Sequence, residues 1–283
     1  MTLIGTSGYS FNDWRGPFYP PHLKRGDWLS YYAKHFPAAE INLTYYRIPA
    51  TKAFEGMARR TPRDYPFFVK THAETTHERI DPRPAMRALL AATAPLHESG
   101  RLRGLLAQFP MNFRNREHER GYLLRLRDLT PPDIPLFAEF RHESWDNEAL
   151  YPFLEAHEIG YCAVDEPPLP GLMPARARVT NGTGYVRFHG RNSASWWGRD
   201  GSGSAAGASR HTDRYDYLYR EEELRNWVKR IREMEEASRR TFVFFNNCYS
   251  GQAVRGARLM QQLMDLPMAG EEQVTLGFEH GMD

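Results

Sequence analysis

The chain has 283 residues, of which 25% are charged and 41% hydrophobic, and its formal net charge is +2. These values are typical of soluble globular proteins and exclude a disordered or fibrous chain. The length does not require a second domain, because an α/β barrel of roughly 250 residues commonly folds around one core. The small net charge, without a dense run of Lys and Arg, does not indicate a nucleic-acid or membrane-binding surface.

The opening residues MTLIGTSGYS lack the positive charge and long apolar segment of an export signal. No later stretch approaches the roughly eighteen consecutive apolar residues that span a bilayer. We therefore expect a cytoplasmic protein without membrane contact.

Short apolar runs alternate with helix-like stretches along the chain, which predicts βα units around a parallel sheet. The eight predicted strands are Leu3–Ser7, Ala39–Thr44, Phe67–Thr71, Gly104–Phe109, Leu136–Arg141, Gly160–Asp165, Gly184–His189 and Thr241–Asn246. Apolar residues at helical spacing predict seven helices at Trp28–Phe36, Thr51–Arg60, Pro84–His97, Glu117–Leu129, Asn147–His157, Glu221–Ala237 and Gln252–Met264.

The segment between the sixth and seventh strands, EPPLPGLMPARARVTNG, contains four prolines and predicts a loop in place of a helix. No predicted strand resembles a protected edge, which favours closure of the sheet. We predict a single (β/α)8 TIM-type barrel over residues 1–267, with an unassigned tail at 268–283. A flexible Gly/Ser-rich loop is expected at 191–210, either as a lid over a site or as a surface insertion.

Several predicted strands end in alternating polar residues, although both faces of a parallel strand are normally buried. The pairs are Glu40 with Asn42, Lys70 with His72, Glu139 with Arg141, and Arg187 with His189; Gln108, Asp165 and Asn246 end three other strands. A period of two places each pair on one face of its strand. We expect these side chains to meet in the lumen at the C-terminal mouth, where barrel enzymes have their active sites.

The leading hypothesis is an enzyme that binds a small anionic or phosphorylated ligand through Lys70, Arg141 and Arg187. Glu139 and His189 are the candidates for proton transfer. The residues expected to orient these groups or the ligand are Glu40, Asn42, Gln108, Asp165 and Asn246. The pattern leaves a hydrolase, a lyase and an isomerase open, and this hypothesis requires no cofactor.

Three alternatives remain. A divalent metal could be held by carboxylates and imidazoles drawn from Glu40, Glu139, Asp165, His142 and His189, although no HExxH motif is present and cations lie nearby in sequence. The barrel could bind a ligand or nucleic acid without turnover, with Trp145, Trp196 and Trp197 as stacking surfaces. The charges could also form an internally paired plug without chemistry. No protein partner is indicated.

The motifs GTSGYSFNDWRGPFYP, EINLTYYRIP, FFVKTHAETTH, AEFRHESW, VDEP, YVRFHGRN and FVFFNNCYSGQAVRGA resemble the YecE-like family, a family of unknown function. The resemblance extends from Gly5 to about Leu263. It implies a TIM-type barrel with the motif residues at one end, and it implies no reaction, substrate or catalytic residue. The stretch Arg199–Ser209 is an insertion relative to the family pattern.

Overall fold

The structure is a computed structural model that describes residues 1–197 and 214–267. Eight parallel strands pair in sequence order, and β8 pairs with β1 to close the barrel. The strands are β1 Thr2–Ser7, β2 Ala39–Ile41, β3 Phe67–Lys70, β4 Leu102–Gln108, β5 Leu136–Glu139, β6 Ile159–Asp165, β7 Thr183–Phe188 and β8 Arg240–Phe245. The predicted TIM-type barrel is confirmed.

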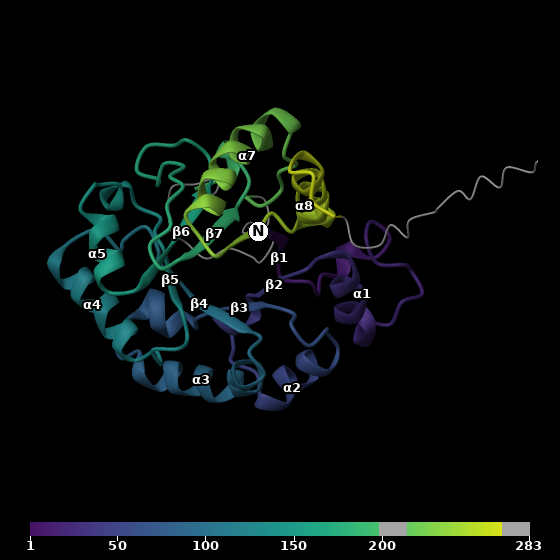
Figure 1. Ribbon diagram of the computed structural model, residues 1–283, viewed down its shortest axis with the longest axis horizontal. Helices are drawn as coiled ribbons and strands as arrows, with labels where there is room; N and C mark the ends of the chain where they lie inside the picture. Colours follow the sequence, from purple (N-terminus) through teal and green to yellow (C-terminus); the bar gives the residue numbers. More distant parts are fainter. Residues whose placement is uncertain (198–213, 268–283) are drawn as a thin grey trace, which may run out of the picture.

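Helices surround the strands as an outer ring (Figure 1). They are α1 Trp28–His35, α2 Thr51–Arg59, α3 Arg83–Glu98, α4 Glu117–Asp128, α5 Leu150–Ala156, α7 Glu221–Glu236 and α8 Gln252–Leu263. Residues 166–182, between β6 and β7, contain no helix, as the prolines predicted. Most of the Gly/Ser-rich loop and the tail at 268–283 lie outside the described residues.

Several expected elements are shorter than the sequence indicated, and strand β5, for example, ends at Glu139 rather than Arg141. Strand β2 ends at Ile41 rather than Thr44, because the chain turns into a 3₁₀ helix over Leu43–Tyr45. Helix α5 begins at Leu150 rather than Asn147. No helix in residues 1–197 and 214–267 combines the length and apolarity needed to cross a bilayer.

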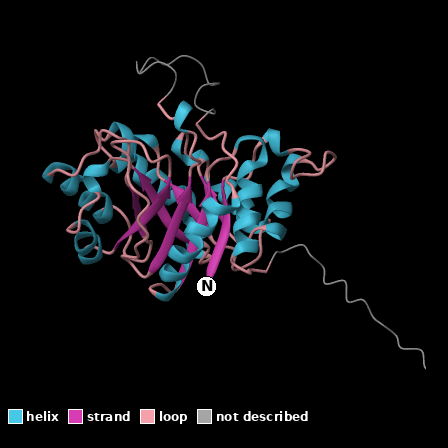
Figure 2. Cartoon of the chain, turned by 90° about the horizontal axis from the view of Figure 1, so that it is seen from above, coloured by secondary structure: helices cyan, strands magenta, loops and turns pink. Residues whose placement is uncertain are grey.

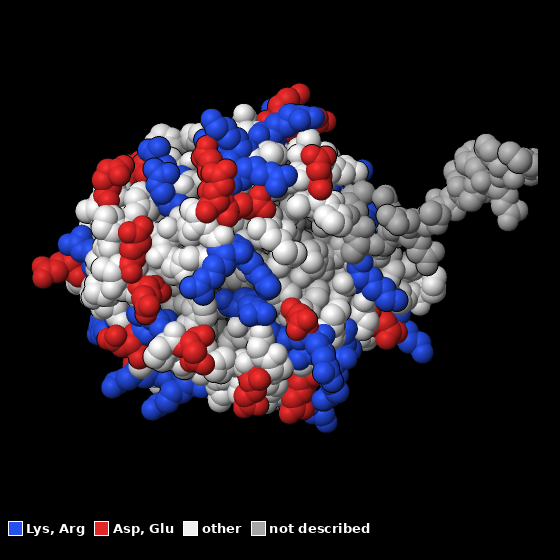
Figure 3. All heavy atoms as spheres, viewed as in Figure 1, with Lys and Arg blue, Asp and Glu red and all other residues white. Residues whose placement is uncertain are grey.

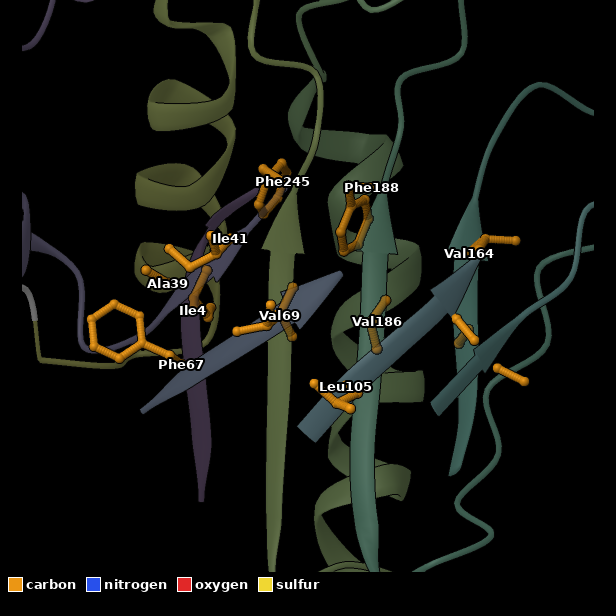
Figure 4. Close-up of a cluster of buried hydrophobic side chains, with 14 of the residues drawn as sticks. Ile4, Ala39, Ile41, Phe67, Val69, Leu105, Val164, Val186, Phe188 and Phe245 are labelled. Carbon is orange, nitrogen blue, oxygen red and sulfur yellow. The ribbon is translucent and has the colours of Figure 1, made fainter. Parts of the chain in front are cut away.

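Apolar side chains form two clusters, one on each side of the barrel wall. The larger packs strands against helices and includes Ile4, Val69, Leu105, Val186 and Phe245 (Figure 4). The smaller fills the lower lumen with Leu3, Ala38, Phe68, Leu106, Phe137, Cys162, Tyr185, Phe242 and Phe244. The lumen is therefore a packed core rather than a pore, as in other TIM-type barrels.

Two glycines make room for the Phe137 ring in this lumen. A Cβ at Gly160 would lie 2.2 Å from Phe137 Cδ1, and a Cβ at Gly104 would lie 2.5 Å from Phe137 Cε2. Real side chains do not approach so closely, so the ring fits only because both neighbours lack a side chain.

We predict that Gly160→Ala lowers the free energy of unfolding by about 1–3 kcal/mol, because the added methyl overpacks the lumen. Gly121→Ala is the control, since a Cβ there meets no atom within 4 Å on helix α4. Urea unfolding of both variants measures the difference. Equal stability of the two variants would contradict this account of the lumen.

Candidate functional site

The polar side chains predicted for the lumen lie above the aromatic plug, toward the C-terminal ends of the strands. Figure 2 shows the strands running from the end that holds the N-terminus toward the opposite end of the barrel. Tyr185 marks the boundary between the two layers, because its ring belongs to the plug and its hydroxyl donates to Glu40 Oε2 at 2.5 Å. The site thus begins directly above the apolar core.

Arg187 lies at the centre of the polar layer. Its Nε and Nη2 donate to the two oxygens of Glu40 at 2.9 and 2.7 Å, and its Nη1 donates to Glu139 Oε2 at 2.5 Å. Arg187 is 1% exposed, and both carboxylates are fully buried. The guanidinium therefore holds two carboxylates in place, and ligand binding by Arg187 stays a prediction.

Glu139 is held ionised by its neighbours. Burial alone would raise the pKa of its carboxyl, but Arg187, Arg141 and His189 outweigh burial and hold this pKa well below its ordinary value. Arg141 Nη2 lies 2.8 Å from Glu139 Oε1. Glu139 is thus a fixed negative charge at the centre of the site.

His189 is buried and neutral. Burial, followed by the charge of Arg141, holds the pKa of its imidazole well below 6.5. Asn246 Nδ2 lies 3.0 Å from His189 Nδ1, and Asn42 Nδ2 donates to Asn246 Oδ1 at 3.3 Å. His189 Nε2 lies 3.2 Å from Glu139 Oε1 and 3.1 Å from Arg141 Nη2, so the ring contacts both members of that ion pair.

Lys70 lies at the end of β3 and is partly exposed. Its Nζ donates to Gln108 Oε1 at 2.8 Å and lies 4.3 Å from the centroid of the Tyr45 ring. Gln108 Nε2 in turn donates to the carbonyl of Phe109 at 2.8 Å, which orients the amide oxygen toward Lys70. Both contacts of the amine are neutral, and no carboxylate in the described part of the chain forms an ion pair with it.

The surroundings of Lys70 disfavour its charged form. Burial, followed by the positive charge of Arg187, lowers the pKa of its ammonium to about 7, although Glu139 and Glu40 act in the opposite direction. Close to half of the amine is therefore uncharged near neutral pH.

Glu166, directly after β6, is the carboxylate that the sequence analysis missed. Its Oε2 accepts from Arg141 Nη1 at 2.6 Å, and its buried Oε1 has no hydrogen-bond partner among the described residues. Burial raises the pKa of the Glu166 carboxyl to about 7. Glu166 also lines a cavity of about 620 Å³ between residues 167–175 and helix α7.

Asp165 does not line the lumen, and the prediction that it would is wrong. Its carboxylate accepts from Arg191 at 2.8 and 2.5 Å, from the Tyr219 hydroxyl at 2.7 Å and from Trp227 Nε1 at 2.5 Å. Trp227 belongs to α7, so Asp165 faces the helices. Strict alternation from the lumen residue Cys162 identifies Glu166 as the lumen-facing carboxylate.

Two aromatic residues lie near the mouth: Trp196, which the sequence offered as a stacking surface, and Tyr45, which the sequence did not single out. Tyr45 contacts Lys70, and Trp196 lies 5.9 Å from the guanidinium carbon of Arg141. Arg214 stacks on Trp196 at 5.0 Å. Tyr45 lies in the 3₁₀ helix after β2, and Trp196 and Arg214 also lie outside the strands, so strand periodicity gives no signal of their orientation. Trp145, in contrast, is fully buried and packs between Phe113 and Phe140, so it offers no stacking surface.

The described part of the chain brings together no group of three His, Cys, Asp or Glu side chains suited to one metal ion. Of the proposed ligands, Glu40 and Glu139 already bind guanidinium groups and Asp165 faces away. Figure 3 shows the end of the barrel that holds the N-terminus, where both signs of charge are interspersed.

We predict that Arg187→Met lowers the free energy of unfolding by about 3–5 kcal/mol at pH 7, because it leaves the buried Glu40 without its ion pair and removes one of the two arginines that pair with Glu139. The depressed pKa of Glu139 contributes stability above its unfolded value, so the loss shrinks as the pH falls below about 4. Arg225→Met, which breaks an exposed pair with Glu221, should cost under about 1 kcal/mol. Denaturant titrations at about pH 3 and about pH 7 measure both. A loss that is independent of pH would contradict the ionic role.

Comparison with known proteins identifies the family of the chain. Residues 3–275 match the family described as "Protein of unknown function DUF72". The "UPF0759 protein YunF" of Bacillus subtilis is 31% identical over 282 residues, which cover 95% of this chain and 97% of that protein.

Solved structures agree. The DUF72 family protein TM1631 of Thermotoga maritima has a TM-score of 0.82 and 42% identity, covering 94% of this chain and 99% of its own. The DUF72 family protein EF0366 of Enterococcus faecalis has a TM-score of 0.81 and 26% identity, covering 97% and 100%. The family resemblance and the barrel that it implied are confirmed at this level. The chain belongs to the DUF72 family of proteins of unknown function.

Proposed function

We propose that this barrel is an enzyme that binds a small anionic substrate at its C-terminal mouth and acts on it by proton transfer. The observation that carries the proposal is the incomplete pairing of Lys70 and Glu166. In the order of strands around the barrel, these residues flank the Glu139–Arg141 pair of β5. Each is buried enough to have a shifted pKa, and neither has a full set of ionic partners.

A plug without chemistry would leave its charges paired. Arg187 and Glu40 meet that description. Lys70, in contrast, has no ion pair among the described residues, and Glu166 Oε1, like Glu139 Oε1, is buried without a hydrogen-bond partner there. Their pKa values are shifted in opposite directions toward neutrality, which suits one to accept a proton and the other to donate one at pH 7. Perturbed groups of this kind gather at active sites.

Arg141 and Lys70 are the cations proposed to bind the anion. Arg141 contacts Glu139 and Glu166 through its two Nη groups, and a guanidinium carries five N–H donors, more than these contacts use. Glu139 and His189, the sequence-based candidates for proton transfer, are proposed instead to hold Arg141 in position. Asn42 and Asn246 fix the imidazole, and Gln108 fixes the amine.

The charge balance of the site makes a specific demand on anion binding. Lys70, Arg141 and Arg187 match Glu40, Glu139 and Glu166 in number when all six are ionised. An anion is accommodated best when Glu166 is protonated and Lys70 is charged, and both conditions are lost as the pH rises through 7.

We predict that lactate and inorganic phosphate bind more tightly at pH 6 than at pH 8, by about tenfold. Lys70→Met should weaken binding at pH 6 by about tenfold or more, because it removes one cation. Lys52→Met, on the exposed face of α2, is the control and should bind as the unaltered protein does. Isothermal titration calorimetry measures all three. Absence of binding at both pH values, or equal binding by the Lys70→Met variant, would refute the proposed function.

A further inference from the structure

The neutral surroundings of Lys70 point to a more specific use of this amine. An amine that must bind an anion is best left fully charged, whereas Lys70 lies against an amide oxygen and an aromatic ring. The groups that face it are two guanidinium groups, two carboxylates and an imidazole, contributed by Arg187, Arg141, Glu139, Glu40 and His77. Arg187 is occupied by the carboxylates, so these do not form an ion pair with Lys70.

The hydrogen bond to Gln108 also suits a nucleophile. A neutral amine donates a proton to the amide oxygen and keeps its lone pair free. The amide is anchored by its bond to the Phe109 carbonyl, so the amine has a fixed acceptor that cannot take its proton away. The imidazole of His77, whose pKa burial and Lys70 lower to about 4, adds no charge at neutral pH.

We propose that Lys70 forms a Schiff base with the carbonyl carbon of a small oxoacid, whose carboxylate is held by Arg141. This inference rests on the proposed function, because it names the substrate class of the same site. A desolvated lysine next to other cations is the arrangement that activates an amine toward carbonyl substrates.

The step is balanced without an oxidant or cofactor. The Lys70 lone pair attacks the carbonyl carbon, a C–N bond forms, and the carbonyl oxygen gains a proton to give a carbinolamine. The C–O bond then breaks and water leaves, so that one amine, one carbonyl and one proton yield one iminium ion and one water. The iminium withdraws electrons from the neighbouring carbon, where Glu166 is proposed to transfer a proton.

The test is reductive trapping of the imine. The full chain is incubated with pyruvate and sodium borohydride at pH 7, digested and analysed by mass spectrometry. Hydride adds to the imine carbon and leaves a stable adduct that equals pyruvic acid less one oxygen atom. We expect modification at Lys70 to exceed that at the exposed Lys52 by at least about tenfold, and to increase between pH 6 and 8 while lactate binding weakens.

Gln108→Glu is the matched variant, because it places a carboxylate of the same shape beside the amine. It should raise the pKa of Lys70, suppress trapping at pH 7 by about tenfold and restore it at higher pH. A merely structural role of Gln108 would not move the pH profile. If the protein binds lactate but Lys70 is trapped no faster than Lys52, the Schiff base is refuted and anion binding stands; if neither pyruvate nor lactate binds, the proposed function itself fails.

Discussion

The arrangement of the whole site depends on the fork of hydrogen bonds from Arg187 to Glu40 and Glu139. Three buried charges would be prohibitive singly, and they are tolerated because each guanidinium edge meets a carboxylate. The fork rests directly on the aromatic plug through the Tyr185 hydroxyl, so its position is set by the packing of the lumen. The polar groups nearer the mouth are arranged around these three fixed charges.

That fixed pattern explains why Lys70 and Glu166 have unusual pKa values. Arg187 donates its hydrogen bonds to Glu40 and Glu139. Its positive charge nevertheless lowers the pKa of the Lys70 ammonium. Arg141 is shared between Glu139 and Glu166, and Glu166 Oε1 has no hydrogen-bond partner among the described residues, so burial raises the pKa of the Glu166 carboxyl. The pKa of Lys70 is therefore lowered and that of Glu166 is raised, both toward neutral pH. The same geometry produces both shifts.

The sequence was sufficient to predict the barrel and most of the lumen, because the period of a strand specifies which residues share a face. Six polar residues lie in the lumen, where alternation along the strands placed them: Glu40, Lys70, Glu139, Arg141, Arg187 and His189. Asp165 was misplaced because it was assigned to the lumen from its position at the end of a strand. Counting every second residue from Cys162, which faces the lumen, leads to Glu166 instead. The pairing of each cation with a particular carboxylate depends on distances across the barrel. No local sequence pattern encodes those distances. Tyr45 and Trp196 lie outside the strands, so strand periodicity did not predict their contacts.

The most direct measurement of this account is the titration of Lys70 itself. In protein with isotopically labelled lysine, the NMR shift of the carbon next to Nζ can be followed from pH 5 to 11, and Lys70→Met assigns the signal. We expect a midpoint near 7 for Lys70, well below the ordinary lysine pKa of about 10.4. A midpoint for Lys70 that coincides with those of the exposed lysines would contradict the account, because the amine would then be an ordinary cation with its charge fully compensated.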